Sequence, residues 1–420
     1  MKAYFIGLKG VGMTSLALAM QDDGWSVSGS DTNESFITDD ILRARNLGVR
    51  PLGSEVPEGT DLIVYSAAYS PPQTKIRTLS LAQALAEFVQ DKKVIAVAGV
   101  GGKTTTTAML AALFHFAGRD VGYYVGTSSI AGLEAPGASG SDPYFVVEAD
   151  EYAISKTDPR PKFALLSPEI VITTNIIHDH PDIYPDEAAT RQVFADLVAS
   201  IPPGGTWICN PADPLTAEIL RGSVPQCRVI TYNSDLPDLD LQVFGAQNQL
   251  DAHAAVLAGV AAGLTREQAI RAIHNYRGAG RRQESHGEVA GRLLYDDYGH
   301  HPREIELTLK SFKEHFPTRR LLLVFESHTY SRTESLLSEF AAALSLSDLT
   351  FIMPIFESAR EKGTPHTVTT ESFASLIEGA IPLTWDTAAS TVWDSSQPGD
   401  LILTMGAGFV YKLHTEFKLK

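Results

Sequence analysis

The chain has 420 residues, which is too long for one hydrophobic core, so we expect two or three domains. Its formal net charge of −16 argues against nucleic-acid binding as the main role, and its two cysteines are too few for a disulfide scaffold. We find no signal peptide and no apolar run of membrane-spanning length, so we expect a cytoplasmic protein without a membrane partner.

The first predicted unit consists of a strand, a glycine-rich turn and a helix. The turn has the spacing G-x-x-G-x-G through Gly7, Gly10 and Gly12, and the next strand, over 25–30, ends at Asp31. Such glycines would let backbone N–H groups approach a nucleotide diphosphate at the helix N-terminus, and an acid after the second strand is typical of a Rossmann-like unit. A plain tight turn is the alternative, because the spacing is not the standard G-x-G-x-x-G.

The rest of this first region continues the alternation of strands and helices. A strand over 62–66 ends at Ser66, and a helix is expected over 79–90. The polar turn at 91–93 separates this helix from the next strand, so the sequence predicts a first domain boundary there.

The stretch 94–107, VIAVAGVGGKTTTT, combines an apolar strand, a glycine loop and a helix that begins with Lys-Thr. This layout is typical of a phosphate-binding loop, because glycines turn backbone N–H groups toward an anion at a helix N-terminus. Lys103 would supply charge to the outer phosphates, and the Thr104 hydroxyl can ligate Mg²⁺. The spacing is G-x-x-G-K-T, shorter than usual between the glycines. We expect nucleotide contacts from Gly99, Gly101, Gly102, Lys103, Thr104 and Thr105.

Two later strands of the central region end in acids or histidine. Glu148 follows a strand over 144–147, and a strand over 170–174 leads into a segment with His180. The carboxyl ends of parallel strands form the edge at which α/β proteins bind ligands, and a carboxylate there can ligate Mg²⁺. A solvated acidic turn and a structural histidine are the alternatives.

A second group of candidates follows the central region. A helix over 248–264 begins with Asn248, and the stretch G-A-G-R-R at 278–282 looks like a hinge that carries cations, with an exposed basic linker as the alternative. Beyond it, a β-α-β-α-β pattern again places polar residues after strands, among them Asp297 and His328.

Taken together, these motifs resemble the Mur ligase family. The matching pieces occur in the family's order and span nearly the whole chain. They are GLKGVGM at 7–13, SGSD at 28–31, AGVGGKTTTT at 98–107, EADE at 148–151, TNIIHDH at 174–180, GAGRR at 278–282, DDYGHHP at 296–302, the serine and arginine within SHTYSRT at 327–333, and MGAG at 405–408.

The resemblance implies an α/β fold with three domains. These are a Rossmann-like domain at 1–91 for a UDP-sugar, a central P-loop ATPase-type domain with a parallel or mixed sheet at 92–279, and a Rossmann-like domain at 280–420 that closes on ATP and receives the amino acid. It also implies ATP-driven amide-bond formation in peptidoglycan precursor synthesis, with UDP-N-acetylmuramate activated as an acyl phosphate.

The resemblance further implies roles for single residues. Catalysis would depend on Lys103, Glu148, His180 and Arg282, and the Mg²⁺ ligands would be Thr104, Glu148 and His180. Further ATP contacts would come from Asn248, Arg282, Asp297 and His301. Substrate contacts would come from Gly10, Gly12, Asp31, Ser66, His180, His328 and Arg332.

The chain departs from the family pattern at three places, and the identity of the amine donor stays open. Val100-Gly101 stands where the family has Thr-His, Asp251 where it has a second asparagine, and Thr329 where it has an arginine. The third domain is closer to members that add L-alanine, which we expect as the donor, whereas 148–163 is closer to members that add the tripeptide L-alanyl-γ-D-glutamyl-diaminopimelate.

Two alternatives belong to other classes. One is a nucleotide-sugar oxidoreductase that uses the first glycine turn, and the other is a non-catalytic nucleotide-binding regulator derived from a ligase. The sequence leaves the choice between a monomer and a homodimer open.

Overall fold

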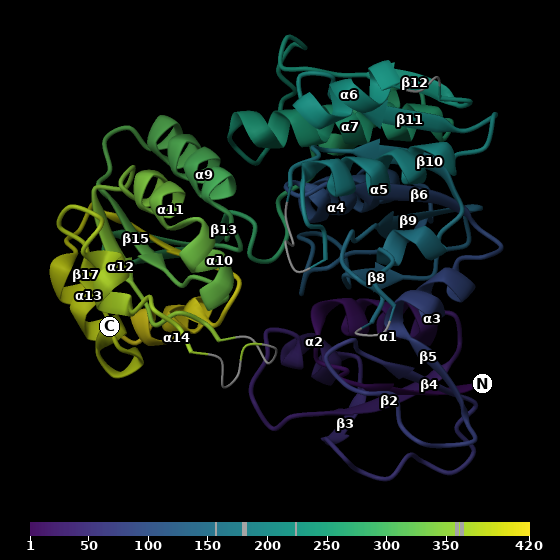
Figure 1. Cartoon of the computed structure of the whole chain (residues 1–420), viewed down its shortest axis with the longest axis horizontal. Helices are drawn as coiled ribbons and strands as arrows, with labels where there is room; N and C mark the ends of the chain where they lie inside the picture. Colours follow the sequence, from purple (N-terminus) through teal and green to yellow (C-terminus); the bar gives the residue numbers. More distant parts are fainter. Residues whose placement is uncertain (156–157, 179–182, 223–224, 358–360, 362–364) are drawn as a thin grey trace. The chain divides into compact units, whose positions relative to one another are not determined.

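The computed structural model describes residues 1–155, 158–178, 183–222, 225–357, 361 and 365–420. Three sheets of five, seven and six strands follow one another along this part of the chain, with helices connecting their strands (Figure 1). The predicted α/β class with three sheet-bearing domains is confirmed. Contacts group the chain into two compact units, the first made of Met1–Val243 and Gln247–Ala279, the second of Phe244–Ala246 and Gly280–Lys420.

The first sheet has the strand order β3-β2-β1-β4-β5, and all its pairs are parallel. The chain adds β2 and β3 on one side of β1 and then β4 and β5 on the other, so the order reverses beside β1, which is where such sheets bind ligands. The strands are β1 (Lys2–Ile6), β2 (Ser26–Asp31), β3 (Gly48–Pro51), β4 (Leu62–Tyr65) and β5 (Arg77–Ser80), and the helices are α1 (Val11–Asp22), α2 (Asp39–Ala44) and α3 (Leu81–Phe88).

The second sheet has the order β12-β11-β10-β6-β9-β7-β8, and only the β7–β8 pair is antiparallel among its described pairs. β6 therefore lies in the middle, and its apolar sequence fits burial on both faces. The strands are β6 (Lys93–Ala98), β7 (Gly122–Tyr124), β8 (Gly137–Ala138), β9 (Tyr144–Glu148), β10 (Pro168–Thr173), β11 (Thr206–Cys209) and β12 (Arg228–Thr231). The helices are α4 (Lys103–Phe116), the 3₁₀ turn η1 (Lys162–Leu165), α5 (Glu187–Ala199), α6 (Pro214–Gly222), α7 (Ala246–Ala261) and α8 (Arg266–Ile273).

The first two sheets share one hydrophobic core. α1 of the first sheet packs against β7 and β8 of the second, and Ser15 Oγ donates a hydrogen bond of 2.6 Å to the carbonyl of Val125. A Cβ at Gly137 would lie 2.1 Å from the Ser15 carbonyl, so only glycine allows this close approach. The boundary predicted between 91 and 92 therefore lies inside one compact unit, and it stays a prediction.

The third sheet has the order β13-β14-β18-β15-β16-β17, with β13–β14 antiparallel and its other described pairs parallel. Helices α9, α11 and α12 cover one face, while α13 and α14 cover the other. The strands are β13 (Glu284–Val289), β14 (Arg292–Asp297), β15 (Leu321–Phe325), β16 (Leu349–Ile352), β17 (Ile381–Pro382) and β18 (Leu401–Met405). The helices are α9 (Pro302–His315), α10 (Tyr330–Ser335), α11 (Leu337–Leu344), α12 (Thr370–Ala374), α13 (Trp385–Ser395), the 3₁₀ turn η2 (Val410–Lys412) and α14 (Leu413–Phe417).

Some predicted elements were wrong in extent. The helix expected over 79–90 begins at Leu81, because residues 79 and 80 belong to β5, a short edge strand that the sequence reading missed. Ser80 then caps the helix through a reciprocal pair of hydrogen bonds with Gln83. Within the described ranges, no helix is both long and apolar enough to cross a membrane.

Candidate active site

The phosphate-binding loop predicted from the sequence joins the carboxyl end of β6 to the first residue of α4. Two of its glycines have positive φ, +131° at Gly99 and +82° at Gly102. A Cβ would lie 2.2 Å from Thr174 Oγ1 at the first position and 2.6 Å from the Asp251 carboxylate at the second. Both positions therefore require glycine, for backbone conformation and for space. Thr105, another predicted contact, lies buried in the first turn of α4.

Residues just after β10 hold this loop. The Asn175 side chain donates to the Gly101 carbonyl at 2.8 Å and accepts from the Gly101 N–H at 3.0 Å. The Thr174 hydroxyl donates to the same carbonyl at 2.6 Å. The Gly101 N–H, which we expected to face a phosphate, is thus directed at Asn175 in this structure. Our sequence reading did not select Asn175, although it lies within the motif TNIIHDH.

Lys103 forms an ion pair with the buried Glu151. Its ammonium lies 2.9 Å from Glu151 Oε2 and also donates to the carbonyls of Gly99 and Val100. Burial alone would lower the pKa of Lys103, but the carboxylates of residues 148, 150 and 151 outweigh it and raise that pKa above its ordinary value. Lys103 therefore stays charged, as a residue that binds phosphate must.

Glu151 was not selected from the sequence. It belongs to the acidic run EADE, from which we selected only Glu148, and its side chain is 4% exposed. The Tyr184 hydroxyl donates to the Glu151 carbonyl at 2.5 Å, and Asp150 pairs with Lys162 at 2.6 Å. Glu151 is therefore buried rather than solvated, and Asp150 is half-exposed and ion-paired, so the run is not a simple solvated acidic turn, which we kept as the alternative.

Thr104 and Glu148 lie side by side at the end of the loop. The Thr104 hydroxyl donates to Glu148 Oε1 at 2.8 Å, and the Gly126 N–H donates to Oε2 at 2.7 Å. A hydroxyl and a carboxylate are hard oxygen donors, so this pair suits Mg²⁺. The described ranges contain no cluster of three or more His, Cys, Asp or Glu side chains that could hold a metal. The third predicted ligand, His180, lies outside the described residues.

The N-terminal end of α7 faces the same loop. Asn248 is in the first turn of α7, and Asp251, one turn later, packs directly against Gly102. Gln247 donates to the Asp251 carboxylate at 3.2 Å. The departure to aspartate at 251 therefore places a carboxylate against the phosphate-binding loop.

The glycine turn of the first sheet also brings its predicted residues together. Asp31 is buried, and its carboxylate accepts from the N–H groups of Lys9 and Thr32, both at 2.7 Å. Ser66, at the end of β4, lies next to Gly7, because a Cβ on that glycine would be 3.0 Å from the serine Cβ. Gly10 precedes α1 as its N-cap residue and offers no side-chain cap.

Gly12, the last glycine of this turn, is required for packing. A Cβ there would lie 2.5 Å from the Tyr124 hydroxyl of β7. This residue therefore contacts the second sheet, and its contribution to a nucleotide site stays a prediction.

In the second unit, predicted residues gather where β14 ends. The Asp297 carboxylate accepts from the N–H groups of Gln283 at 2.9 Å and Gly299 at 2.8 Å. Burial raises the pKa of Asp297 to about 6, although the nearby Arg282 charge opposes this shift. The Arg282 guanidinium lies 4.8 Å from the Tyr298 ring centre. His301 caps α9, accepting from the Arg303 N–H at 3.3 Å.

A further group follows β15. His328 stacks on Phe356 with ring centres 5.1 Å apart, and its pKa is lowered to about 4, mainly by burial and further by the Arg332 charge. Glu361 accepts from the N–H groups of Tyr330 at 3.2 Å and Ser331 at 3.0 Å. The structure thus brings the predicted amino-acid-site residues His328 and Arg332 together and adds an acid that the sequence reading did not select.

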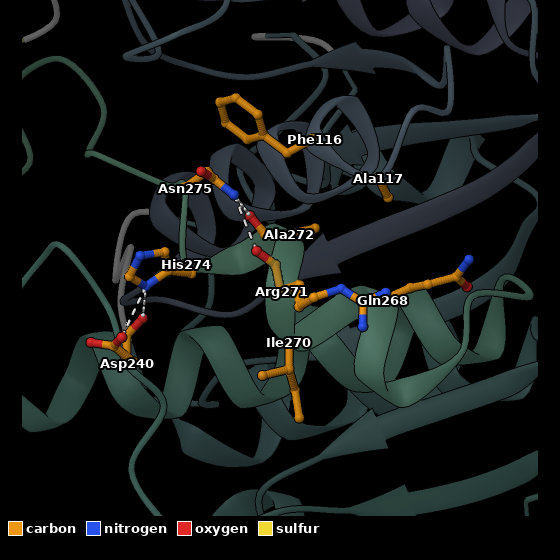
Figure 2. A pocket seen from close by; sticks show the side chains of 9 residues that line it. All are labelled: Phe116, Ala117, Asp240, Gln268, Ile270, Arg271, Ala272, His274 and Asn275. Atoms are coloured by element: carbon orange, nitrogen blue, oxygen red, sulfur yellow. Dashed lines mark hydrogen bonds and ion pairs between the residues drawn. The ribbon is translucent and has the colours of Figure 1, made fainter.

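A cavity of about 680 Å³ lies at the other end of α4, and Figure 2 shows its lining. Phe116 contributes to it, and His274 points toward Asp240, with its Nδ1 3.2 Å from the Asp240 carboxylate. Residues 103 and 116 are separated by roughly 20 Å along the helix at about 1.5 Å per residue. None of the predicted site residues lines this cavity.

Family models for successive parts of Mur ligases match most of the chain. Residues 2–93 match the model described as "Mur ligase family, catalytic domain", residues 97–261 the "Mur ligase middle domain", and residues 281–408 the "Mur ligase, glutamate ligase domain".

Full-length relatives and solved structures agree with these matches. The UDP-N-acetylmuramate–L-alanine ligase of Desulfitobacterium hafniense is 32% identical over 447 residues, with 98% of each protein covered. The murein peptide ligase of Psychrobacter arcticus is 25% identical, with a TM-score of 0.76, covering 99% of this chain and 98% of that one. The UDP-N-acetylmuramate–alanine ligase of Thermotoga maritima, at 21% identity with the same coverage, shares the fold with a TM-score of 0.77.

Proposed function

The chain belongs to the Mur ligase family and is an ATP-dependent ligase, and we propose that it joins L-alanine to the lactyl carboxylate of UDP-N-acetylmuramate. The observation that carries this proposal is the ion-paired, largely buried Lys103 at the start of α4, next to the paired Thr104 and Glu148. Full-length similarity to enzymes named for this reaction supports the choice of substrates.

The reaction proceeds in two displacements. A carboxylate oxygen of UDP-N-acetylmuramate attacks the γ-phosphorus of ATP, the bond to the bridging oxygen breaks, and ADP leaves. The amine of L-alanine then attacks the carbonyl of the acyl phosphate, the C–O bond to phosphate breaks, and the amine loses a proton. Activation is needed because an ionised carboxylate is a poor acyl donor, so the protein's task is positioning and charge neutralisation.

The residues of the first unit divide this work. Lys103 holds the β- and γ-phosphates and exchanges its pairing with Glu151 for a phosphate oxygen. Thr104 and Glu148, with His180, would hold Mg²⁺, which neutralises phosphate charge when it is bound. Contacts to the UDP group come from the first glycine turn, at Gly10, Gly12, Asp31 and Ser66.

Other residues with proposed roles belong to the second unit. Arg282 contacts phosphate, Asp297 holds the ribose, and His301, the N-cap residue of α9, adds a further ATP contact. Asn248, from the first unit, adds a nucleotide contact. His328 and Arg332 receive the carboxylate of the amine donor. We propose a cytoplasmic location, because the proposed reaction consumes ATP.

A second amine donor has its own support. The murein peptide ligase of Psychrobacter arcticus covers 99% of the chain, and the motif at 148–163 resembles the tripeptide-adding members. Thr329, in place of arginine, removes one cation from the carboxylate pocket. The tripeptide L-alanyl-γ-D-glutamyl-diaminopimelate is therefore the second candidate.

An amine panel tests the proposal. The purified enzyme is given ATP, Mg²⁺ and UDP-N-acetylmuramate with L-alanine, L-serine, glycine or the tripeptide, and ADP and the coupled product are measured. We expect the highest kcat/KM with L-alanine and no coupled product without UDP-N-acetylmuramate. Turnover with the tripeptide alone would reassign the donor, and no product with any amine would favour the non-catalytic regulator.

A further inference from the structure

Arg281, the residue before the predicted phosphate contact, is buried within the second unit. Its side chain is 8% exposed. Nε donates to Asp296 Oδ2 at 2.7 Å, Nη2 to the Gly406 carbonyl at 2.6 Å, and Nη1 to the Gly408 carbonyl at 3.1 Å. Its guanidinium also lies 5.3 Å and 4.7 Å from the ring centres of Tyr298 and Tyr411.

This set of contacts requires a guanidinium. Three acceptors lie in three directions around the group, while two aromatic rings lie within cation–π distance of it. A lysine ammonium is a point charge without this planar fork, so it cannot satisfy the carboxylate and both carbonyls in the same geometry.

The main chain of the same segment is fixed to the same strand end. The Tyr298 N–H donates to the Arg281 carbonyl at 2.7 Å, and the Gln283 N–H donates to Asp297 at 2.9 Å. Both Arg281 and Gln283 have positive φ, +58° and +49°, which non-glycine residues adopt only where their surroundings enforce it. Arg282 lies between these two anchored residues.

The partners of Arg281 are themselves fixed. The second oxygen of Asp296 accepts from the Thr404 hydroxyl at 2.6 Å. Gly408 packs on Glu326, since a Cβ at that glycine would lie 2.4 Å from the glutamate Cδ. The guanidinium therefore joins three rigid elements: the segment 280–283, the end of β14, and the glycine loop after β18.

We propose that Arg281 is a positioning residue, which holds Arg282 and Asp297 in the arrangement that binds ATP. The proposal rests on the proposed function, because that function makes Arg282 and Asp297 the ATP contacts. Every contact described for the Arg281 side chain is with another group of the protein.

Arg292 provides a matched control in the same unit. It is also buried, and it donates to Ser396 Oγ at 2.6 Å and to the Ser396 carbonyl at 2.9 Å, with its guanidinium 4.3 Å from the Trp393 ring centre. Arg292 is the first residue of β14 and Asp297 is the last, so Arg292 lies at the opposite end of this strand from the predicted site.

The test compares Arg281→Lys with Arg292→Lys by thermal unfolding and by steady-state kinetics with ATP, UDP-N-acetylmuramate and L-alanine. We expect both variants to lose thermal stability. Only Arg281→Lys should raise the KM for ATP, by about tenfold or more, and lower kcat, because a displacement of about 1 Å is costly in catalysis. Its KM for UDP-N-acetylmuramate should stay within about twofold of the wild-type value.

A purely structural role would reduce the folded fraction and thus the apparent kcat, with an unchanged KM for ATP, and that result would overturn the proposal. If Arg281→Lys does not fold, Asp296→Asn weakens the same interaction and is measured in its place. If the wild-type enzyme ligates no amine, the proposed function is wrong, but the role of Arg281 can still be tested. The affinity of each lysine variant for a fluorescent ATP analogue is then measured, and only Arg281→Lys should bind it more weakly than the wild type.

Discussion

The predicted residues around Lys103 and those around Asp297 are held in different ways. In the first region, side chains pair with side chains, Lys103 with Glu151 and Thr104 with Glu148, and backbone groups of Gly99, Val100 and Gly126 add further hydrogen bonds. In the second, the Asp297 carboxylate is held by two backbone N–H groups, those of Gln283 and Gly299.

This difference suggests different responses to ligand. A side-chain pair can exchange one partner for a phosphate oxygen or a metal ion without moving the backbone. The Asp297 carboxylate, held by two backbone N–H groups, should keep its place whether ATP is present or not. We therefore expect substitutions near Lys103 to change ligand chemistry and those near Asp297 to change the site's shape or protonation.

Lys103→Ala should have the largest effect. Ligation should fall at least about 10³-fold, because the charge that stabilises the transferring phosphoryl group is lost. Folding should also lose about 3 kcal/mol, since Glu151 is left buried without its cation. The matched control is Lys103→Ala with Glu151→Gln, which should regain stability in urea unfolding but not activity. Undiminished turnover in either variant would remove Lys103 from the mechanism.

Glu148→Gln should change the metal dependence of the reaction. An amide is a weaker ligand for Mg²⁺ than a carboxylate, so the Mg²⁺ concentration at half-maximal rate should rise by about tenfold, with a smaller change in the KM for the amine. The Gly126 N–H retains an acceptor in the amide oxygen, so the fold is preserved. An unchanged Mg²⁺ titration would show that Glu148 is not a metal ligand.

Protonation of Asp297 should lower kcat/KM for ATP at acidic pH, while the protein stays folded. The pKa of Asp297 is about 6, above its ordinary value of 3.8. Between these two pH values the carboxyl group is protonated in the folded protein and ionised in the unfolded chain. As pH falls through 6, this group therefore adds stability, while its loss of charge weakens nucleotide binding. The groups that face it are Arg282, Asp296 and the N–H groups of Gln283 and Gly299.

The measurement is kcat/KM for ATP between pH 5 and 8 together with thermal unfolding. We expect kcat/KM of the wild-type enzyme to fall at low pH with an apparent pKa of about 6, and we expect no such fall in the Asp297→Asn variant. An equal fall of kcat/KM in that variant would show that another group titrates, such as the γ-phosphate of ATP, and would contradict the role of Asp297.

Thr329→Gly should have the smallest effect. Thr329 is β-branched and has φ +72° and ψ 137°, a region that glycine occupies more readily. Relief of this strain exceeds the entropy cost of glycine, so unfolding in urea should show a gain of about 1 kcal/mol, with an unchanged KM for the amine. A loss of stability would show that the threonine side chain contributes more packing than the strain costs.

Local patterns predicted much of the fold. The phosphate-binding loop followed from its glycines and Lys-Thr, and the buried strands followed from their apolar runs. β13 was missed because its sequence, ESHGEV, is polar and it lies at the edge of its sheet. Its partner in the hairpin, β14, was found because Leu293 and Leu294 are apolar.

The candidate site was only partly predictable for a different reason. The choice of Glu151 rather than another acid of EADE as the partner of Lys103 depends on how the chain turns after β9, which no local pattern encodes. Asn175 holds Gly101 across two strands that are adjacent only in the folded sheet. Such pairs depend on tertiary structure.

The most direct test of the account follows oxygen from the substrate into phosphate. UDP-N-acetylmuramate labelled with ¹⁸O in its lactyl carboxylate is incubated with ATP and L-alanine, and the released phosphate is analysed by mass spectrometry. The acyl phosphate route predicts one ¹⁸O atom in each phosphate formed. Unlabelled phosphate alongside full amide formation would contradict it.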